Sequence, residues 1–119
     1  MRVTGIDHVQ VAAPPGCEAA ARAFYGGLLG LEELAKPPAL AARGGCWFRA
    51  GAAELHVGVE EPFAPARKAH PGLVVDDLDA LRARLEAEGI AVRHDESLPG
   101  VRRVHTEDPF GNRLELRAS

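Results

Sequence analysis

Residues that could carry chemistry gather in the segments of the chain that read as strands. They include four of the five histidines and the glutamates Glu54 and Glu115: His8, Glu54, His56, His70, His105 and Glu115. Imidazole nitrogens and carboxylate oxygens bind divalent transition metals and move protons at neutral pH. Brought together by a fold, such a set would form a metal centre or an acid–base site.

Strand parity predicts which of these side chains share a face, because successive side chains point to opposite sides of a sheet. The polar parity carries His8, Gln10, Glu54, His56, His70, Arg103, His105, Glu115 and Arg117, with Trp47 and Arg49 as further candidates. The apolar parity carries Val9, Val11, Leu55, Val57, Val59, Leu73, Val75, Leu114 and Leu116. We expect the apolar face to pack on the helices.

The alternative is that the polar face is simply solvated, as one face of an antiparallel sheet often is. A solvated face usually carries Thr, Ser, Lys and Glu, whereas this one carries most of the histidines and no Lys. We therefore favour a functional polar cleft. His94 lies outside the pattern, and we interpret it as a surface residue.

The first half of the chain reads as one strand, one helix and three strands. A strand is predicted within 3–13 and ends at the Pro-Pro-Gly break, and an Ala-rich helix is predicted over 17–30 with Phe24, Leu28 and Leu29 towards the core. Further strands are expected over 31–35, 46–50 and 53–59, with a loop at 36–45 and a turn at Gly51.

The second half repeats this order after a Pro-broken linker. A strand that begins at His70 precedes a helix that Asp76 or Asp77 caps and Gly89 ends, with Leu78, Leu81 and Leu85 as its apolar stripe. Strands follow at 90–93, 101–107 and 113–118, the last after the turn Asp-Pro-Phe-Gly-Asn.

A His and a Glu recur at nearly equal distances in the two halves. His70 follows His8 by 62 residues, and Glu115 follows Glu54 by 61 residues. This spacing suggests an internal duplication. We expect one domain over 1–119, with a first module at about 1–60, a linker at about 60–68 and a second module at about 69–119.

Composition limits the class of protein. The 119 residues are 46% hydrophobic and 26% charged, with a net charge of −3 and no basic patch, so nucleic acid is not an expected partner. No apolar run is long enough for a membrane span, and the N-terminal stretch does not resemble a signal peptide. Cys17 and Cys46 lack metal-site spacing and are too few for a disulfide framework, which favours a cytoplasmic protein.

Three segments, GIDHVQV, HPGLVVDDLDALRARLEAEGI and DPFGNRLEL, together resemble the vicinal oxygen chelate superfamily of glyoxalases, bleomycin-resistance proteins and extradiol dioxygenases. The resemblance implies an α+β fold of two βαβββ modules, whose curved mixed sheets form a cleft with the helices on the outer face. Single-domain members generally form homodimers, so a homodimer is expected.

The resemblance also implies a divalent metal ion, Zn, Fe, Mn or Ni, held by His8, His70 and Glu115. Glu54 matches a fourth ligand of the glyoxalase I-like members, and His56 lies two residues further along the same face. Glu54 could instead be a general base or an acceptor for an imidazole N–H, and the same options stay open for His56.

Other residues of the polar face have predicted roles in catalysis or binding. His105 precedes Glu115 by ten residues, and it could donate a proton, contact substrate or be merely solvated. Arg103 could bind an anionic group by a bidentate contact or be solvated. Trp47 is expected at the cleft wall or the edge of the core, and we group it with His56 and Arg103 as substrate-binding candidates.

Two functions compete. We favour a metal-dependent enzyme that acts on a small oxygenated substrate by Lewis-acid catalysis, with glyoxalase-like isomerase or lyase chemistry ahead of ring-cleaving dioxygenase or thiol-transfer chemistry. The alternative is a protein of the bleomycin-resistance type that sequesters a ligand without turnover. Such proteins bind planar drugs in aromatic grooves, whereas this chain has one Trp and one Tyr.

Overall fold

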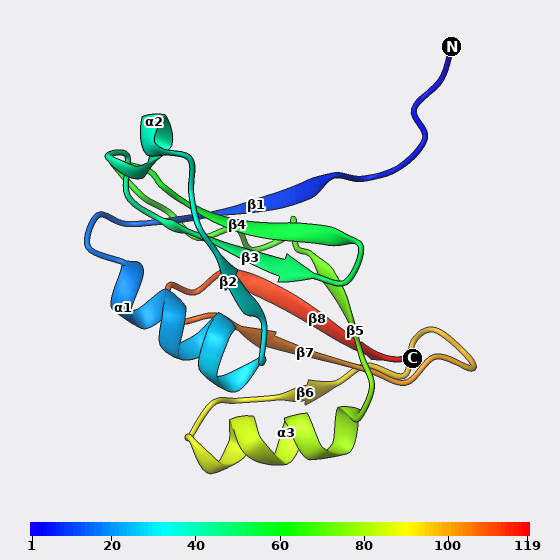
Figure 1. The fold of residues 1–119 in the computed structure, drawn as a ribbon. Helices are drawn as coiled ribbons and strands as arrows, with labels where there is room; N and C mark the ends of the chain where they lie inside the picture. Colours follow the sequence, from blue (N-terminus) through cyan, green and yellow to red (C-terminus); the bar gives the residue numbers. More distant parts are fainter. The chain divides into compact units, whose positions relative to one another are not determined.

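The computed structural model describes residues 1–119. They form two compact units, Met1–Ala64 and Pro65–Ser119 (Figure 1). None of the helices combines the length and the apolar character that crossing a bilayer would require.

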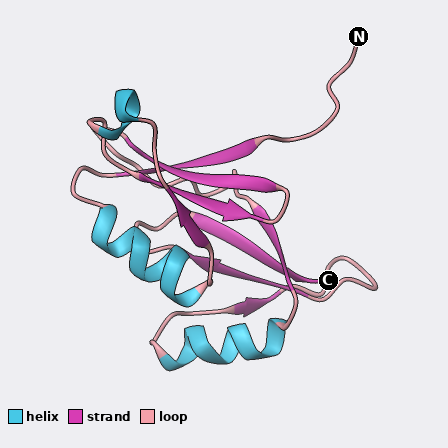
Figure 2. Ribbon diagram, viewed as in Figure 1, coloured by secondary structure: helices cyan, strands magenta, loops and turns pink.

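The first unit is a four-stranded mixed sheet with helical segments. Its strands are β1 (His8–Ala13), β2 (Glu32–Leu34), β3 (Cys46–Ala50) and β4 (Ala53–Val59), and its helices are α1 (Glu18–Ala21), η1 (Arg22–Leu28) and α2 (Pro38–Ala41). The spatial order is β1-β4-β3-β2, with β1 parallel to β4 and the other pairs antiparallel (Figure 2).

The second unit has the same topology. Its strands are β5 (Gly72–Val75), β6 (Arg93–His94), β7 (Arg103–Glu107) and β8 (Arg113–Ala118), and its helix is α3 (Leu78–Ala87). The order β5-β8-β7-β6, with β5 parallel to β8, matches the first unit strand for strand. Two βαβββ units with mixed sheets confirm the predicted α+β class.

The predicted helix over 17–30 is a short α-helix that continues as the π-helix η1. Leu29 N–H donates to the carbonyl of Phe24, five residues earlier, over 2.9 Å. Gly26 and Gly27 have low helix propensity, which weakens the regular α pattern here. The wider turn buries Phe24 and Tyr25, while Leu28 and Leu29 are only half-buried. Leu28 and Leu29 are therefore less buried than predicted, and the buried Tyr25 was not predicted.

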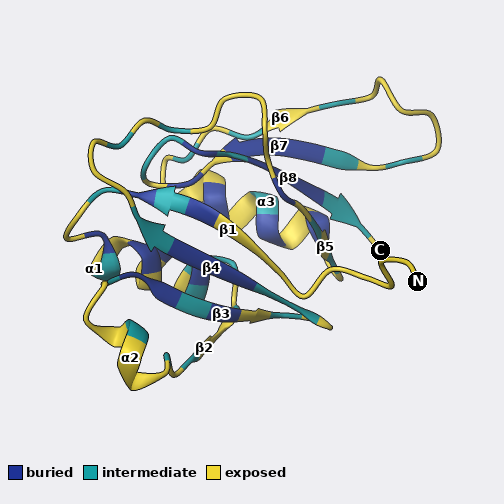
Figure 3. Ribbon diagram, turned by 90° about the horizontal axis from the view of Figure 1, so that it is seen from above, coloured by how far each residue is buried: buried dark blue, intermediate teal, exposed yellow.

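Helix α3 follows the predicted signals closely. Asp77 Oδ1 accepts a hydrogen bond of 3.0 Å from Ala80 N–H, so Asp77 is the N-cap. Leu78, Leu81 and Leu85 are buried. Figure 3 shows that α3 carries both buried and exposed positions, as an amphipathic helix does. Gly89 ends it with a φ of 75°.

The predicted boundaries of two strands needed correction. β5 begins at Gly72 rather than at His70, because Pro71 has no N–H and joins the sheet only through its carbonyl, which accepts from Glu115 N–H over 3.1 Å. β6 is found at Arg93–His94 rather than at 90–93. His94 is exposed, as predicted.

The apolar parity forms the core in the central strands. Leu55, Val57, Leu114 and Leu116 are at most 1% exposed. Val9 departs from the prediction with 36% exposure, because it lies near the start of β1, an edge strand of its sheet. The prediction of a single domain with a cleft between its sheets stays a prediction.

The turn 108–112 fixes where β8 begins. Asp108 Oδ1 accepts hydrogen bonds from the N–H groups of Phe110 and Asn112, each over 2.9 Å. Asn112 in turn donates to Asp108 Oδ2 and accepts from Ala66 N–H. Gly111 has a φ of 90°, which favours glycine. The turn therefore sets the register that points Glu115 to the polar face.

Candidate metal centre

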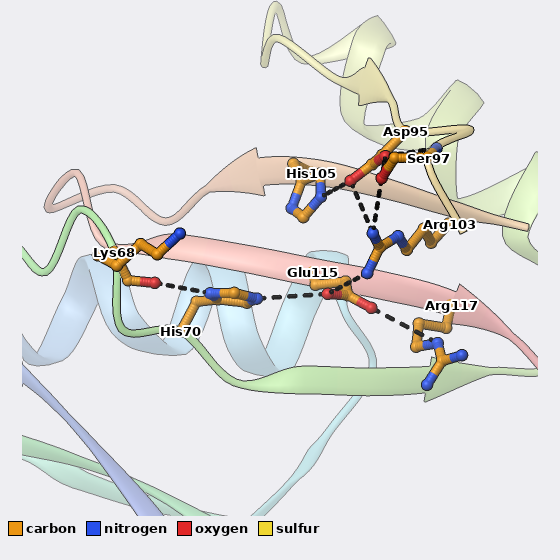
Figure 4. Close-up of polar contacts among 8 residues, drawn as sticks. All are labelled: Lys68, His70, Asp95, Ser97, Arg103, His105, Glu115 and Arg117. Carbon is orange, nitrogen blue, oxygen red and sulfur yellow. Dashed lines mark hydrogen bonds and ion pairs between the residues drawn. The ribbon is translucent and has the colours of Figure 1, made fainter. Parts of the chain in front are cut away.

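His70 and Glu115 meet in the second unit. His70 Nε2 lies 3.3 Å from Glu115 Oε1, and its Nδ1 lies 2.8 Å from the carbonyl oxygen of Lys68 (Figure 4). The Pro71 carbonyl bonded to Glu115 N–H brings the preceding residue, His70, next to β8. A backbone contact and a side-chain contact thus orient the same ring.

The two contacts of His70 differ in which ring nitrogen has to carry a proton. The Lys68 carbonyl can only accept, so Nδ1 must carry a proton. A neutral ring then presents a lone pair from Nε2 to the carboxylate of Glu115. The Nε2–Oε1 contact is favourable only if Nε2 is protonated as well, or if a cation lies between the two atoms. A metal-binding His characteristically donates its other N–H to a backbone carbonyl or a carboxylate.

Glu115 is 7% exposed and is surrounded by cationic groups. Arg103 Nη1 lies 3.2 Å from Oε1, and Arg117 Nε lies 3.5 Å from Oε2. Burial acts to raise the pKa of Glu115, but its contacts with His70 and Arg103 outweigh burial and hold the pKa below its usual value. Glu115 is therefore a carboxylate at neutral pH.

His105 lies on β7 directly opposite Glu115 of β8 and is 5% exposed. Its Nε2 contacts Asp95 Oδ2 at 2.7 Å, and its buried Nδ1 has no hydrogen-bond partner. The His70 and His105 rings meet edge to face, with centroids 5.8 Å apart. His70, His105 and Glu115 each place one potential ligand atom within 4.8 Å of the other two.

Arg103 joins Glu115 to the segment that follows β6. Its Nη2 lies 3.0 Å from Asp95 Oδ2 and 3.1 Å from Ser97 Oγ (Figure 4). Asp95 accepts from both the hydroxyl and the N–H of Ser97, and these bonds, together with that from His105, keep the pKa of Asp95 far below its usual value. Asp95 is therefore an anion that His105 and Arg103 share.

The polar face of the first unit is built differently. The rings of Trp47 and His56 stack at 4.1 Å with an interplanar angle of 2°, and His8 stacks on His56 at 4.3 Å. His56 Nε2 lies 2.9 Å from Glu54 Oε1. His8 Nδ1 lies 2.8 Å from Asp7 Oδ2, which leaves His8 Nε2 available. Glu54 also lies 3.8 Å from Arg49 Nη1.

The His–Glu pairs of the two halves occupy different register positions in their sheets. His8 is directly opposite Glu54 in the β1–β4 register, whereas Gly72 is opposite Glu115 in the β5–β8 register. His70 therefore lies two residues before the position that corresponds to His8. The topology repeats, but the near-equal spacing noticed in the sequence does not mark equivalent positions in the two sheets.

The described contacts sort the predicted residues into two groups. The second unit brings together His70, Arg103, His105 and Glu115, and the first brings together His8, Trp47, Glu54 and His56. Asp95 and Ser97, which contact His105 and Arg103, were not predicted from the sequence. The Asp-x-Ser spacing, which is typical of a side-chain-capped turn, was the available signal.

The donors of the second unit suit a divalent metal ion. Two imidazoles and one carboxylate are a common ligand set for Zn, Fe, Mn and Ni. One of the imidazole nitrogens, His105 Nδ1, is buried without a hydrogen-bond partner. In the neutral His70 ring the proton is on Nδ1, which donates to Lys68, so the lone pair of Nε2 faces the Glu115 carboxylate. Arg103 also contacts Glu115 Oε1, so an ion there must compete with it for that oxygen.

Paired βαβββ units with histidine and glutamate on the polar faces of their sheets define a class of small α+β proteins. Residues 5–116 match the Glyoxalase/Bleomycin resistance protein/Dioxygenase superfamily, and the chain belongs to this family. No curated protein matches the chain significantly in sequence.

Solved structures of the family resemble the chain over nearly its whole length. A protein of Bacillus anthracis described as a glyoxalase family protein is 50% identical, with a TM-score of 0.95 over 100% of this chain and 98% of its own. TnmS3, an antibiotic-binding protein from Streptomyces sp. CB03234, is 26% identical, with a TM-score of 0.75 over 99% and 98% of the two chains. Lactoylglutathione lyase from Agrobacterium tumefaciens is 24% identical, with a TM-score of 0.76 over 100% and 96%, a likeness of fold.

Proposed function

We propose that the protein is a metal-dependent enzyme that acts on a small oxygenated substrate, with glyoxalase-like isomerase or lyase chemistry as the lead subclass. The observation that carries this proposal is the orientation of His70. Its Nδ1 donates to the Lys68 carbonyl, and its Nε2 faces the buried Glu115 carboxylate. A divalent ion between these two groups would satisfy both of them.

His70 and Glu115 are the ligands on which the proposal depends. His8, in the other unit, is the predicted third ligand, and the bond from its Nδ1 to Asp7 suits a ligand whose Nε2 is free. Glu54, already paired with His56, is proposed as a base or as an acceptor for an imidazole N–H. The identity of the metal among Zn, Fe, Mn and Ni is left to measurement.

When bound, a divalent ion supplies a Lewis acid that polarises substrate oxygens and stabilises negative charge as it develops. The protein's own groups would then bind and orient the substrate. Arg103 is paired with Asp95 and Glu115, so it would bind an anionic group of the substrate only by releasing one of these carboxylates. His56 is buried and stacks with both Trp47 and His8, so a planar group would pack against an outer ring of this stack.

The experiment compares His70→Ala with His94→Ala, which removes an exposed histidine of the same unit. Protein purified without an affinity tag is analysed for its elements and assayed for turnover of small substrates that carry two adjacent oxygens. We expect about one metal ion per chain in the native protein and in His94→Ala, and loss of metal and turnover in His70→Ala. Stoichiometric metal in His70→Ala would contradict the ligand assignment.

A second candidate function is ligand sequestration without turnover. The parallel stack of Trp47, His56 and His8 favours it, because planar ligands bind between or upon aromatic rings. The likeness to an antibiotic-binding protein supports it as well. A native protein that takes up none of the four metals, yet quenches its single Trp fluorescence on binding a planar ligand, would favour sequestration over catalysis.

We also propose that the chain is a homodimer in the cytoplasm, as the family often dimerises. Light scattering on the purified protein would then give a mass twice that of the 119-residue chain. A monomer at micromolar concentration would contradict this assembly without bearing on the metal ligands.

A further inference from the structure

We propose that His105, held in place by Asp95, supplies a further donor to the metal centre of His70 and Glu115. The inference rests on the proposed function, because it adds a ligand from β7 to a centre that would otherwise draw on His70 and Glu115 in this unit. It assigns His105 to the ion itself rather than to proton transfer, and it gives Asp95 the role of a positioning residue.

The two nitrogens of His105 have different surroundings. Nε2 lies 2.7 Å from Asp95 Oδ2, while Nδ1 is buried and has no partner. The Asp95 carboxylate already accepts from Ser97 and faces Arg103, and it can only accept, so Nε2 must carry the proton. In the neutral ring Nδ1 therefore holds a lone pair and no hydrogen. Such a nitrogen can bind a metal ion, but it cannot donate a proton to substrate.

An unpartnered buried nitrogen is costly, because it loses its hydrogen bonds to water without replacing them. His105 is 5% exposed, so solvent does not compensate for the loss. A metal ion at Nδ1 would do so. His70 and His105 would then share one arrangement, in which one nitrogen binds the ion and the other donates to an oxygen, of Lys68 or of Asp95.

Position and distance agree with a shared ion. His105 and Glu115 are direct partners in the β7–β8 register, and one nitrogen of each imidazole and one Glu115 oxygen all lie within 4.8 Å of one another. Metal–nitrogen bonds of about 2.0–2.1 Å place the donors around one ion within roughly 4 Å of each other, so side-chain rotation would have to bring His105 Nδ1 to the ion.

Asp95 is itself fixed from several sides. Its Oδ1 accepts from Ser97 N–H and Ser97 Oγ, and its Oδ2 contacts both His105 and Arg103. Because these contacts fix the Asp95 carboxylate, it holds the His105 imidazole in one tautomer and one orientation. Loss of such an orienting partner lowers metal affinity by about 10-fold to 100-fold in comparable sites.

The test measures metal affinity in the full chain for His105→Gln, Asp95→Asn and His70→Ala, with His94→Gln as the matched control. Zn²⁺ affinity is obtained by competition with a chelator, and the visible absorption spectrum of bound Co²⁺ reports the number and type of ligands. We expect His105→Gln to lose about 100-fold or more in affinity and to change the Co²⁺ spectrum, and Asp95→Asn to lose about 10-fold. His94→Gln should match the native protein.

The outcomes separate this inference from the proposed function. If His70→Ala loses the metal while His105→Gln keeps native affinity and a native Co²⁺ spectrum, the His105 assignment is overturned and the proposed function stands. Metal retained in His70→Ala, or no metal uptake by the native protein, overturns both. Circular dichroism checks the fold of His105→Gln. Should that variant be unfolded, Asp95→Asn decides, and native affinity there overturns the inference.

Discussion

Arg103 Nη1 lies 3.2 Å from Glu115 Oε1, the same oxygen that faces His70 Nε2. The side chain of Arg103 is 18% exposed and that of Glu115 is 9% exposed, so the pair is largely removed from water. In the protein without metal, Arg103 therefore neutralises a carboxylate that would otherwise be buried with only His70 and the more distant Arg117 beside it.

Arg103→Gln should lower the free energy of unfolding of the metal-free protein by about 1–3 kcal/mol, because it leaves both Glu115 and Asp95 short of a charged partner. Urea denaturation in the presence of a chelator measures this change. Arg102→Gln is the control, because Arg102 pairs with Asp79 through side chains that are both exposed. Equal effects of the two substitutions would show that the buried ion pair contributes no more to the free energy of unfolding than the exposed pair does.

Glu18 should make stability depend on pH. Its Oε2 accepts from Gly45 N–H over 2.7 Å, and this bond lowers the pKa of Glu18 below its usual value. A carboxyl whose pKa is lowered on folding contributes stability above its unfolded pKa, and that contribution is lost as the pH falls through the folded pKa. Glu18→Gln should thus be less stable than the native protein by about 1 kcal/mol at pH 7.

The difference between Glu18→Gln and the native protein should shrink below about pH 4.5, near the usual pKa of a glutamate. Urea unfolding at a series of pH values tests this trend. Glu60→Gln, at an exposed glutamate of the same unit, should show no such trend. A difference for Glu18→Gln that stays constant from pH 7 to pH 3 would contradict the predicted role of the Gly45 bond.

Gly45 should resist any substitution that adds a side chain. Its φ is 86°, and a Cβ there would stand 2.1 Å from the carbonyl oxygen of Val57. Gly51 also has a positive φ, 62°, but a Cβ there meets nothing within 4 Å. We expect Gly51→Ala to cost about 1–2 kcal/mol from backbone strain alone. Gly45→Ala should cost several kcal/mol more, because backbone atoms must move.

Thermal unfolding of the two glycine variants isolates the effect of the close approach, since both carry the same conformational penalty. Similar melting temperatures for Gly45→Ala and Gly51→Ala would show that the β3–β4 sheet relaxes around the added methyl group.

Asp108 should stabilise the protein through its turn. Asp108→Ala removes the acceptor of two N–H groups, those of Phe110 and Asn112, and of the Asn112 amide. The expected cost is about 1–3 kcal/mol, because buried donors lose their partner. Chemical denaturation measures it, with Glu107→Ala, at the exposed preceding residue, as the control. Because the turn sets the start of β8, Asp108→Ala should also weaken metal binding at Glu115, whereas Glu107→Ala should not.

The sequence predicted those parts of the fold that local chemistry decides. The cap at Asp77, the leucine stripe of α3 and the glycine at its end depend on residues within a few positions of each other, and they were confirmed. The π-helix η1 was not predicted, because a shift from four-residue to five-residue hydrogen bonding leaves no strong trace in residue type.

For the candidate site too, features set by local sequence were predicted and features set by distant contacts were not. Alternation along each strand was enough to place His105 and Glu115 on one face, and the register of β7 and β8 makes them direct neighbours. Asp95 was not predicted, because it lies outside the strands, where no periodicity indicates the direction of its side chain.

In the sequence by itself, the resemblance of three segments indicated the family. Hydrophobic periodicity and short-range turn signals predicted the order of the two βαβββ units and the face on which each polar strand residue lies. Only the tertiary structure decided which polar groups meet. The hydrogen bond from Glu115 N–H to the Pro71 carbonyl brings His70 to β8, and the contact of His105 with Asp95 leaves one imidazole nitrogen buried without a partner. Both depend on residues at least ten positions apart. The first contact follows from the pairing of β5 with β8, and the second joins β7 to the segment after β6, so local sequence alone reveals neither.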